Sequence, residues 1–287
     1  MSLQHQRRDA VPRFAPPAPV TSNALKAPKT PATPPADDYV PFCEQVRRLC
    51  GVDLLQYKRA QMERRIRSWT ERRGTPALAD YATRLKSDRE ELDAFLDRVT
   101  INVSQLWRHP EQWKALHDTI LPELAARGRV RAWSAGCSYG AEAYTLAAVS
   151  RESIPRARVE IRGTDLDRRM VARARLGRFS EDDGRGAPAA ALKKWFPHGQ
   201  ATEDLRRIVS FEVGDLLRMP VRSASYDLVM CRNTVIYFTE EVRDALHRRL
   251  VDALTPGGYL VVGTSERVAA ARELGLTSPF HFIYRKG

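Results

Sequence analysis

The sequence predicts an α/β protein in which a small all-helical domain precedes a mostly parallel sheet with helices on both faces. Two observations support this. Residues 38–108 carry apolar side chains at helical spacing throughout, whereas short β-rich runs alternate with helical ones beyond residue 128. Strands that alternate with helices are typical of parallel β-α-β units. The chain has 287 residues, 43% of them hydrophobic, so it is long enough for two domains and a tail.

The N-terminal part divides into a tail and a helical domain. Residues 1–37 hold eight prolines and few apolar side chains, so burial cannot offset the entropy of ordering and we expect a disordered tail. Residues 38–108 are the expected helical domain, and a linker helix is expected at about residues 110–127. The apolar positions at helical spacing are Phe42, Val46 and Leu49, then Met62, Ile66 and Trp69, then Leu92, Phe95 and Val99.

The second domain is expected over residues 109–287. The final run, 280–285, is expected to pair antiparallel near one sheet edge. Strands are predicted at 130–133, 159–163, 209–213, 226–230 and 259–262, and helices at 141–150, 167–176 and 239–253.

The loop after the first expected strand is where an open parallel sheet binds its ligand. It contains Gly136 and Gly140, which allow close approach of the backbone and a sharp turn into a helix. Their spacing is not that of the dinucleotide fingerprint. Glu142, in the first helical turn, would repel a pyrophosphate and attract an ammonium group. S-adenosylmethionine carries an ammonium group and no phosphate, so the loop favours it as the cofactor.

Polar residues follow the next three strands in order. Asp165 comes after the second strand and can accept both ribose hydroxyls, and Asp215 comes after the third, where it can accept from an adenine amino group. Either one alone is typical of a turn or a helix cap. The fourth strand ends in Arg232 and Asn233, with Tyr237 before the next helix. Together these residues predict a site at the carboxyl edge of the sheet.

Composition limits the class of protein. Four cysteines and six histidines show no metal-ligand spacing, so we expect reduced thiols and no metal. No run of roughly 18 to 20 apolar residues is present, and the N-terminus lacks a signal-peptide pattern, so we expect a cytoplasmic protein without membrane insertion. The net charge of +12 indicates an acidic partner of a kind that composition does not identify.

From about residue 38 to its end, the chain resembles the CheR-type chemotaxis receptor methyltransferases. These convert glutamate side chains of chemoreceptors to methyl esters with S-adenosylmethionine, which leaves S-adenosylhomocysteine. The resemblance implies a Rossmann-like methyltransferase domain behind the helical one. It is carried by residues 51–58 (GVDLLQYK), 100–108 (TINVSQLWR), 133–144 (WSAGCSYGAEAY), 164–167 (TDLD), 231–238 (CRNTVIYF) and 263–266 (GTSE).

The resemblance also implies roles for individual residues. Arg108, Arg232 and Tyr237 would lie nearest the transferred methyl group and hold the substrate carboxylate, which needs no general base because it attacks already ionised. Cofactor contacts are implied for Asn102, Ser104, Arg108, Glu142, Asp165, Asp215, Leu216, Arg232 and Asn233, with Gly136 beside them in the loop. Ala141, Ala143, Trp107 and Asp215 depart from the usual family residues, and none of these changes removes a group that the mechanism needs.

Two features concern the partner. Only 14 residues separate Phe196 from Phe211, so a receptor-docking β-subdomain is reduced to about residues 196–208, and we expect no dependence on a tethering peptide. Lys58, Arg65 and Arg72 fall at heptad spacing on one helix face, which we expect to contact the acidic, helical cytoplasmic domain of a chemoreceptor.

Two alternatives remain open. A nucleic-acid methyltransferase would suit the charge, but residues 232–235 (RNTV) lack the Pro-Pro segment of amino-group methylation, and no Pro-Cys pair suits cytosine attack. A non-catalytic cofactor-binding signalling module would suit the altered glycine loop and the tail. We favour the receptor methyltransferase, with no nucleic acid as partner.

Overall fold

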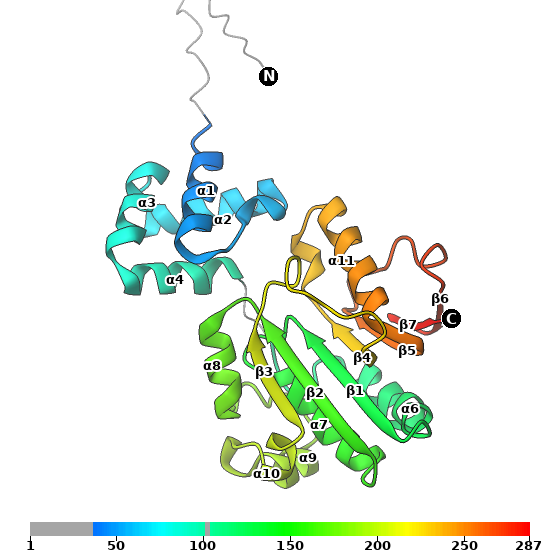
Figure 1. Ribbon diagram of the computed structural model, residues 1–287. Helices are drawn as coiled ribbons and strands as arrows, with labels where there is room; N and C mark the ends of the chain where they lie inside the picture. The colour runs from blue at the N-terminus through cyan, green and yellow to red at the C-terminus, as the bar shows by residue number, and fades with distance from the viewer. Residues whose placement is uncertain (1–36, 101–103) are drawn as a thin grey trace, which may run out of the picture. The chain divides into compact units, whose positions relative to one another are not determined.

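The computed structural model describes residues 37–100 and 104–287. The expected tail, apart from residue 37, and Asn102 lie outside these residues. The first part is a bundle of four helices, α1 (Tyr39–Cys50), α2 (Arg59–Arg72), α3 (Leu78–Ser87) and α4 (Arg89–Thr100), with a 3-10 turn at Leu54–Gln56 (Figure 1). Its centre is aromatic: Phe42, Tyr81 and Phe95 have ring centroids 5.8 to 6.4 Å apart.

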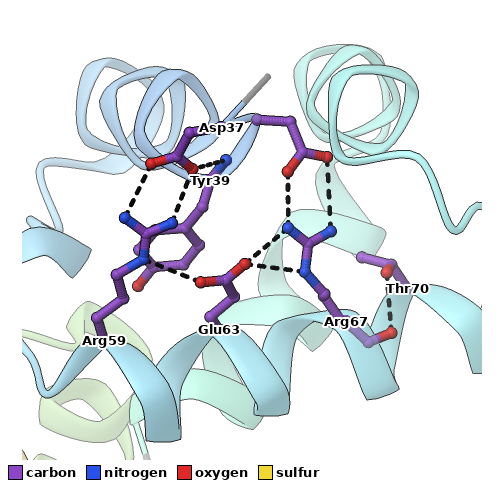
Figure 2. A network of polar contacts seen from close by, with 7 residues as sticks. Asp37, Tyr39, Arg59, Glu63, Arg67 and Thr70 are labelled. Atoms are coloured by element: carbon purple, nitrogen blue, oxygen red, sulfur yellow. Dashed lines mark hydrogen bonds and ion pairs between the residues drawn. The ribbon is translucent and has the colours of Figure 1, made fainter. Parts of the chain in front are cut away.

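An ion-pair network fastens the start of α1 to α2 (Figure 2). Arg59 donates to both oxygens of Asp37 at 2.8 Å and to Glu63 at 3.0 Å. Arg67 bridges Glu63 and Asp38 in the same way. These pairs are largely exposed and each adds little stability. Their consequence is that Arg59 and Arg67 are neutralised, so they add little to the free positive charge of α2.

The expected linker helix is one continuous helical stretch. It consists of α5 (Pro110–Ala115), a π-helical turn at Leu116–Ile120 and α6 (Leu121–Ala125). Its buried side chains, which include Trp113 and Ile120, belong to the same apolar core as one face of the sheet.

The second part is a seven-stranded sheet in the order β3-β2-β1-β4-β5-β7-β6. The first five strands are parallel, and β7 runs antiparallel to both β5 and β6. Helices α6 and α7 pack on one face and α11 on the other (Figure 1). The bounds are β1 Arg129–Ala135, α7 Ala141–Ser153, β2 Arg158–Asp165, α8 Arg168–Leu176, β3 Val209–Val213, β4 Tyr226–Cys231, α11 Glu240–Ala253, β5 Leu254–Val262, β6 Leu276–Phe280 and β7 Ile283–Lys286.

The expectation of helices on both faces holds only in part. Residues 214–225, all of them described, contain no helix, and in Figure 1 no helix lies in front of β1, β2 and β3. The reason is visible in β2, where buried Val159 and Ile161 alternate with Glu160 and Arg162. One face of this strand is therefore polar. Above it lies an open groove of about 560 Å³.

Two further segments differ from expectation. The expected single strand at 280–285 is a hairpin, because Phe282 adopts φ +62° and reverses the chain between β6 and β7. Residues 196–208, expected as a reduced β-subdomain, contain a 3-10 turn at Pro197–Gly199 and the short helix α10 (Glu203–Arg206). They follow α9 (Ala189–Trp195), whose alanines and lysines favour helix.

Strands β3 and β6 are the outer strands of the sheet. On β3, Arg175 donates from Nε and Nη2 to the carbonyl oxygen of Phe211, at 3.3 and 3.0 Å. Strand β6 contains Pro279, which has no N–H group to donate.

Candidate functional site

A cavity of about 320 Å³ lies at the carboxyl ends of β1 to β4, a volume within the range of small-molecule sites. Both parts of the chain line it. The helical bundle and the segment after it supply Asp53, Gln56, Tyr57, Thr100, Ser104, Gln105 and Arg108, and the sheet loops supply Gly136, Ser138, Glu142, Asp165, Leu166, Asp215 to Arg218, Arg232 to Thr234, Tyr237 and Phe238.

The loop after β1 requires its glycines. Gly136 has φ +80° and Gly140 has φ +88°, both in the left-handed region that disfavours side chains. A Cβ atom on Gly136 would lie 2.6 Å from the Thr234 hydroxyl oxygen. The backbone N–H of Gly136 donates to the carbonyl of Thr164 at 2.8 Å, which holds this loop against the end of β2.

Asp165 is held by backbone N–H groups on both sides. Its two carboxylate oxygens accept from Ser138 at 2.7 Å and from Asp167 at 2.9 Å. Burial raises the pKa of Asp165, and these two N–H donors oppose the rise. Each oxygen has a second lone pair, so the carboxylate can also accept from a ligand hydroxyl.

Glu142 and Arg232 form a buried pair at the end of β1 and β4. Glu142 accepts from the Ser134 hydroxyl at 2.7 Å and lies 3.5 Å from the Arg232 guanidinium. Burial raises the pKa of Glu142, and Arg232 opposes that rise. Arg232 also donates to the carbonyl of Arg108 and lies over the ring of Trp113, 5.2 Å from its centroid. Arg232 therefore fixes the carboxylate of Glu142 and the backbone at Arg108.

Two buried polar atoms in the cavity wall have no hydrogen-bond partner among the described residues. They are Nε of Arg232, a donor, and Oδ1 of Asn233, an acceptor. A buried polar group without a partner is costly, so such atoms in a cavity wall indicate a polar ligand. The donor and acceptor fit the amino-acid end of S-adenosylmethionine, which carries a carboxylate and an ammonium group.

The sequence predicts no role for Glu266 itself, although residues 263–266 carry part of the family resemblance. Its carboxylate is buried and accepts four backbone N–H groups, those of Gly263 at 2.6 Å, Asn233 at 2.8 Å, Val235 at 3.0 Å and Ile236 at 3.3 Å. Burial raises its pKa, and the N–H donors oppose the rise. The loop that presents Asn233 and Tyr237 is thus folded around this one carboxylate. A signal was present, since Glu266 follows the fifth expected strand at the same sheet edge.

At Tyr237, on the wall of the cavity, the helical bundle contacts the loop after β4. Tyr237 lines the cavity, and its carbonyl accepts from the N–H of Lys58 at 2.9 Å. Arg65 lies with its guanidinium 5.9 Å from the centre of the Tyr237 ring. Ser104 also lines the cavity, and its carbonyl accepts from the Tyr139 hydroxyl. The N-terminal half of α2 therefore lies beside the residue expected to meet the substrate.

Every predicted site residue that the structure describes lines this one cavity, and Asn102 lies outside the described residues. The ten are Ser104, Arg108, Gly136, Glu142, Asp165, Asp215, Leu216, Arg232, Asn233 and Tyr237. Within residues 37–100 and 104–287, no cluster of three His, Cys, Asp or Glu side chains could hold a metal ion, and no helix is long and apolar enough to cross a membrane.

Comparison with known proteins places the chain in a family. Residues 37–100 match the CheR methyltransferase all-alpha domain, and residues 102–278 match the CheR methyltransferase SAM binding domain. A chemotaxis protein methyltransferase of Listeria innocua is 33% identical over 87% of this chain and 97% of its own length. One from Listeria monocytogenes is 34% identical over the same shares, and chemotaxis protein methyltransferase 1 of Pseudomonas aeruginosa is 31% identical over 80% of this chain and 89% of its own. The chain belongs to the CheR methyltransferase family.

Proposed function

We propose that this protein transfers a methyl group from S-adenosylmethionine to glutamate carboxylates of chemoreceptor cytoplasmic domains. The products are glutamate methyl esters and S-adenosylhomocysteine. The relatives named above are chemotaxis protein methyltransferases. The observation that carries the proposal is the single cavity that brings Glu142, Asp165 and Asp215 together with Arg108 and Tyr237.

Three carboxylates suit the three parts of the cofactor. Asp165 would accept from the ribose hydroxyls, as strand-end carboxylates do in other open α/β sheets. Glu142 would attract the ammonium group, and Oδ1 of Asn233 is a second acceptor in the wall of the same cavity. Asp215, with Leu216 next to it, would accept from the adenine amino group.

When bound, the cofactor supplies an electrophilic methyl group on a sulfonium. The chain's own residues then have to hold the substrate carboxylate in line with it, and no general base is needed because the carboxylate is ionised at neutral pH. Orientation of this kind contributes up to roughly 7 to 11 kcal/mol. Arg108 and the Tyr237 hydroxyl are the groups we assign to it. Because Arg232 is engaged by Glu142, we assign it to positioning that carboxylate, with Nε left to meet the ligand.

The basic face of α2 is the proposed contact for the receptor. Lys58, Arg65 and Arg72 have no carboxylate partner among the described residues, in contrast to Arg59 and Arg67 on the same helix. Arg65 lies beside Tyr237, so this face leads to the cavity mouth. An acidic helical substrate lying along it would present a glutamate there. The helical character of residues 196–208 supports independence from a tethering peptide. Micromolar binding of a receptor C-terminal peptide would contradict this part.

The decisive experiment uses labelled S-adenosylmethionine with candidate chemoreceptor cytoplasmic domains and scores base-labile release of methanol. We expect label on receptor glutamates. If S-adenosylhomocysteine binds but no receptor is labelled, the protein is a cofactor-binding module, and base-stable label on nucleic acid would support the other alternative. Arg72→Glu should raise KM for the receptor and leave cofactor binding unchanged, whereas Arg48→Glu, the same change at an exposed arginine of α1, should change neither.

A further inference from the structure

We propose that Arg218 is a positioning residue that sets cofactor affinity by joining two carboxylates across one end of the cavity. The two are Asp53 from the helical bundle and Asp215 from the loop after β3. This inference rests on the proposed cofactor site. It assigns to the helical bundle a direct part in forming the adenosine end of that site.

The three side chains lie in contact at the cavity wall. Arg218 donates from Nη2 to Oδ2 of Asp53 at 2.9 Å, and its Nε lies 3.7 Å from Oδ2 of Asp215. All three residues line the cavity. Asp53 and Arg218 are 165 positions apart in the sequence, so this pair connects the two parts of the chain at the site itself.

Both carboxylates are held in place by their own neighbours. The side chain of Asp53 is 8% exposed and accepts from the N–H of Leu55 at 3.3 Å, which fixes it at the start of the 3-10 turn, and its Oδ2 also lies 3.3 Å from the guanidinium of Arg47 on α1. Asp215 accepts through Oδ1 from the N–H of Leu217 at 2.9 Å, so its Oδ2 is the oxygen that faces Arg218. The guanidinium of Arg218 therefore bridges two carboxylates, Asp53 and Asp215, whose positions are already fixed by backbone N–H groups.

Charge explains why a cation is needed at this position. Four carboxylates line the cavity, those of Asp53, Glu142, Asp165 and Asp215. The cofactor has its cationic groups at the sulfonium and ammonium end, and its adenine is neutral. Asp53 and Asp215 would thus repel each other without any compensating charge on the ligand. Arg47 offsets part of the charge of Asp53 from the side of the bundle, whereas Arg218 is the one cation among the described residues that is paired with Asp215 and that contacts both carboxylates.

The bridged carboxylates would contact the adenosine part of the ligand, which S-adenosylmethionine and S-adenosylhomocysteine have in common. Loss of Arg218 should therefore weaken both by a similar factor. It should not slow methyl transfer at saturating cofactor, because the groups at the methyl end are untouched. A defect confined to affinity separates this role from one in catalysis.

The test is a double-mutant cycle with Arg218→Gln and Asp53→Asn. Titration calorimetry with S-adenosylhomocysteine, without receptor, should show each single variant binding about five- to tenfold more weakly and the double variant no more weakly than the worse single one. KM for S-adenosylmethionine should rise by a similar factor with kcat unchanged. Arg222→Gln, in the same loop and without an ion pair among the described residues, is the matched control and should bind like the wild type.

The proposal is overturned if the single variants bind like the wild type or if their losses multiply in the double variant. If Arg218→Gln does not fold, Arg218→Lys serves instead, since a lysine reaches only one of the two carboxylates and should give a smaller loss. Wild-type protein that binds S-adenosylhomocysteine but methylates no receptor would refute the proposed function and leave this inference standing. Wild-type protein that does not bind it would refute both.

Discussion

Replacement of Glu266 by glutamine tests whether one buried carboxylate shapes the loop at the cavity. In the wild type, Oε2 accepts from the N–H groups of Asn233 and Gly263, and Oε1 accepts from those of Val235 and Ile236. Glutamine has nearly the same shape but only one acceptor oxygen. Its amide nitrogen would face two N–H donors, which would lose their acceptor in a buried place.

The cost follows from that count. A buried donor left without a partner costs about 1–3 kcal/mol, so Glu266→Gln should lower the free energy of unfolding by about 2–6 kcal/mol. For a chain of this size, each kcal/mol corresponds to roughly 2–4 °C in Tm, which gives a loss of roughly 4–24 °C. Tyr237 is presented by the same loop, so kcat should fall as well.

Thermal unfolding followed by circular dichroism, with and without S-adenosylhomocysteine, measures this effect. The control is Glu241→Gln, at an exposed position in the first turn of α11, which should unfold like the wild type. A Glu266→Gln protein with a Tm within about 1 °C of the wild type would refute the reasoning, because two unsatisfied donors cannot cost so little.

Three further changes have defined outcomes. Tyr237→Phe removes one hydroxyl donor to the substrate, so it should lower kcat by about tenfold, or about 1.4 kcal/mol, with little change in the KM for S-adenosylmethionine. An unchanged kcat in steady-state assays would show that Tyr237 has no part in the mechanism. Asp165→Ala should weaken cofactor binding by calorimetry at least tenfold, about 1.4 kcal/mol, and unchanged affinity would place the ribose elsewhere. Burial lowers the pKa of His247 from 6.5 to about 4, although the nearby Asp244 opposes this shift. Between pH 6.5 and 4 the unfolded chain therefore binds more protons than the folded one. The contribution of His247 makes the free energy of unfolding of the wild type fall as the pH drops through that window. His247→Leu should lose this part of the pH dependence in urea unfolding, and equal slopes for the two proteins would contradict it.

The alternation of strands and helices was readable from the sequence because buried strands and amphipathic helices have different periods. The site was readable for a related reason. Carboxyl ends of parallel strands meet at one edge, so Asp165, Asp215 and Arg232 had to converge once the strands were assigned. The convergence of these residues depends only on the order of the strands and not on packing between the two parts of the chain.

The features that were missed depend on contacts between distant residues. Glu266 acts on backbone N–H groups of residues about 30 positions earlier, and backbone donors look alike in any sequence. The pairing of Arg218 with Asp53 spans two domains. The pairing of Arg232 with Glu142 is not determined by the sequence, because a strand-end arginine can bind either a neighbouring carboxylate or a ligand. The hairpin of β6 and β7 depends on the left-handed backbone of Phe282, which residue type does not predict.

The two outer strands bear on how copies of this protein behave at high concentration. An exposed strand edge is a template on which another chain can add a strand, and that is a common start of aggregation. On β3 the carbonyl of Phe211 is already taken by Arg175, and the bulky cation stands where an incoming backbone would have to lie. On β6, Pro279 interrupts the row of donors. Both ends of the sheet thus discourage growth by strand addition, so the polar face of β2 stays exposed without making the sheet a nucleus for association.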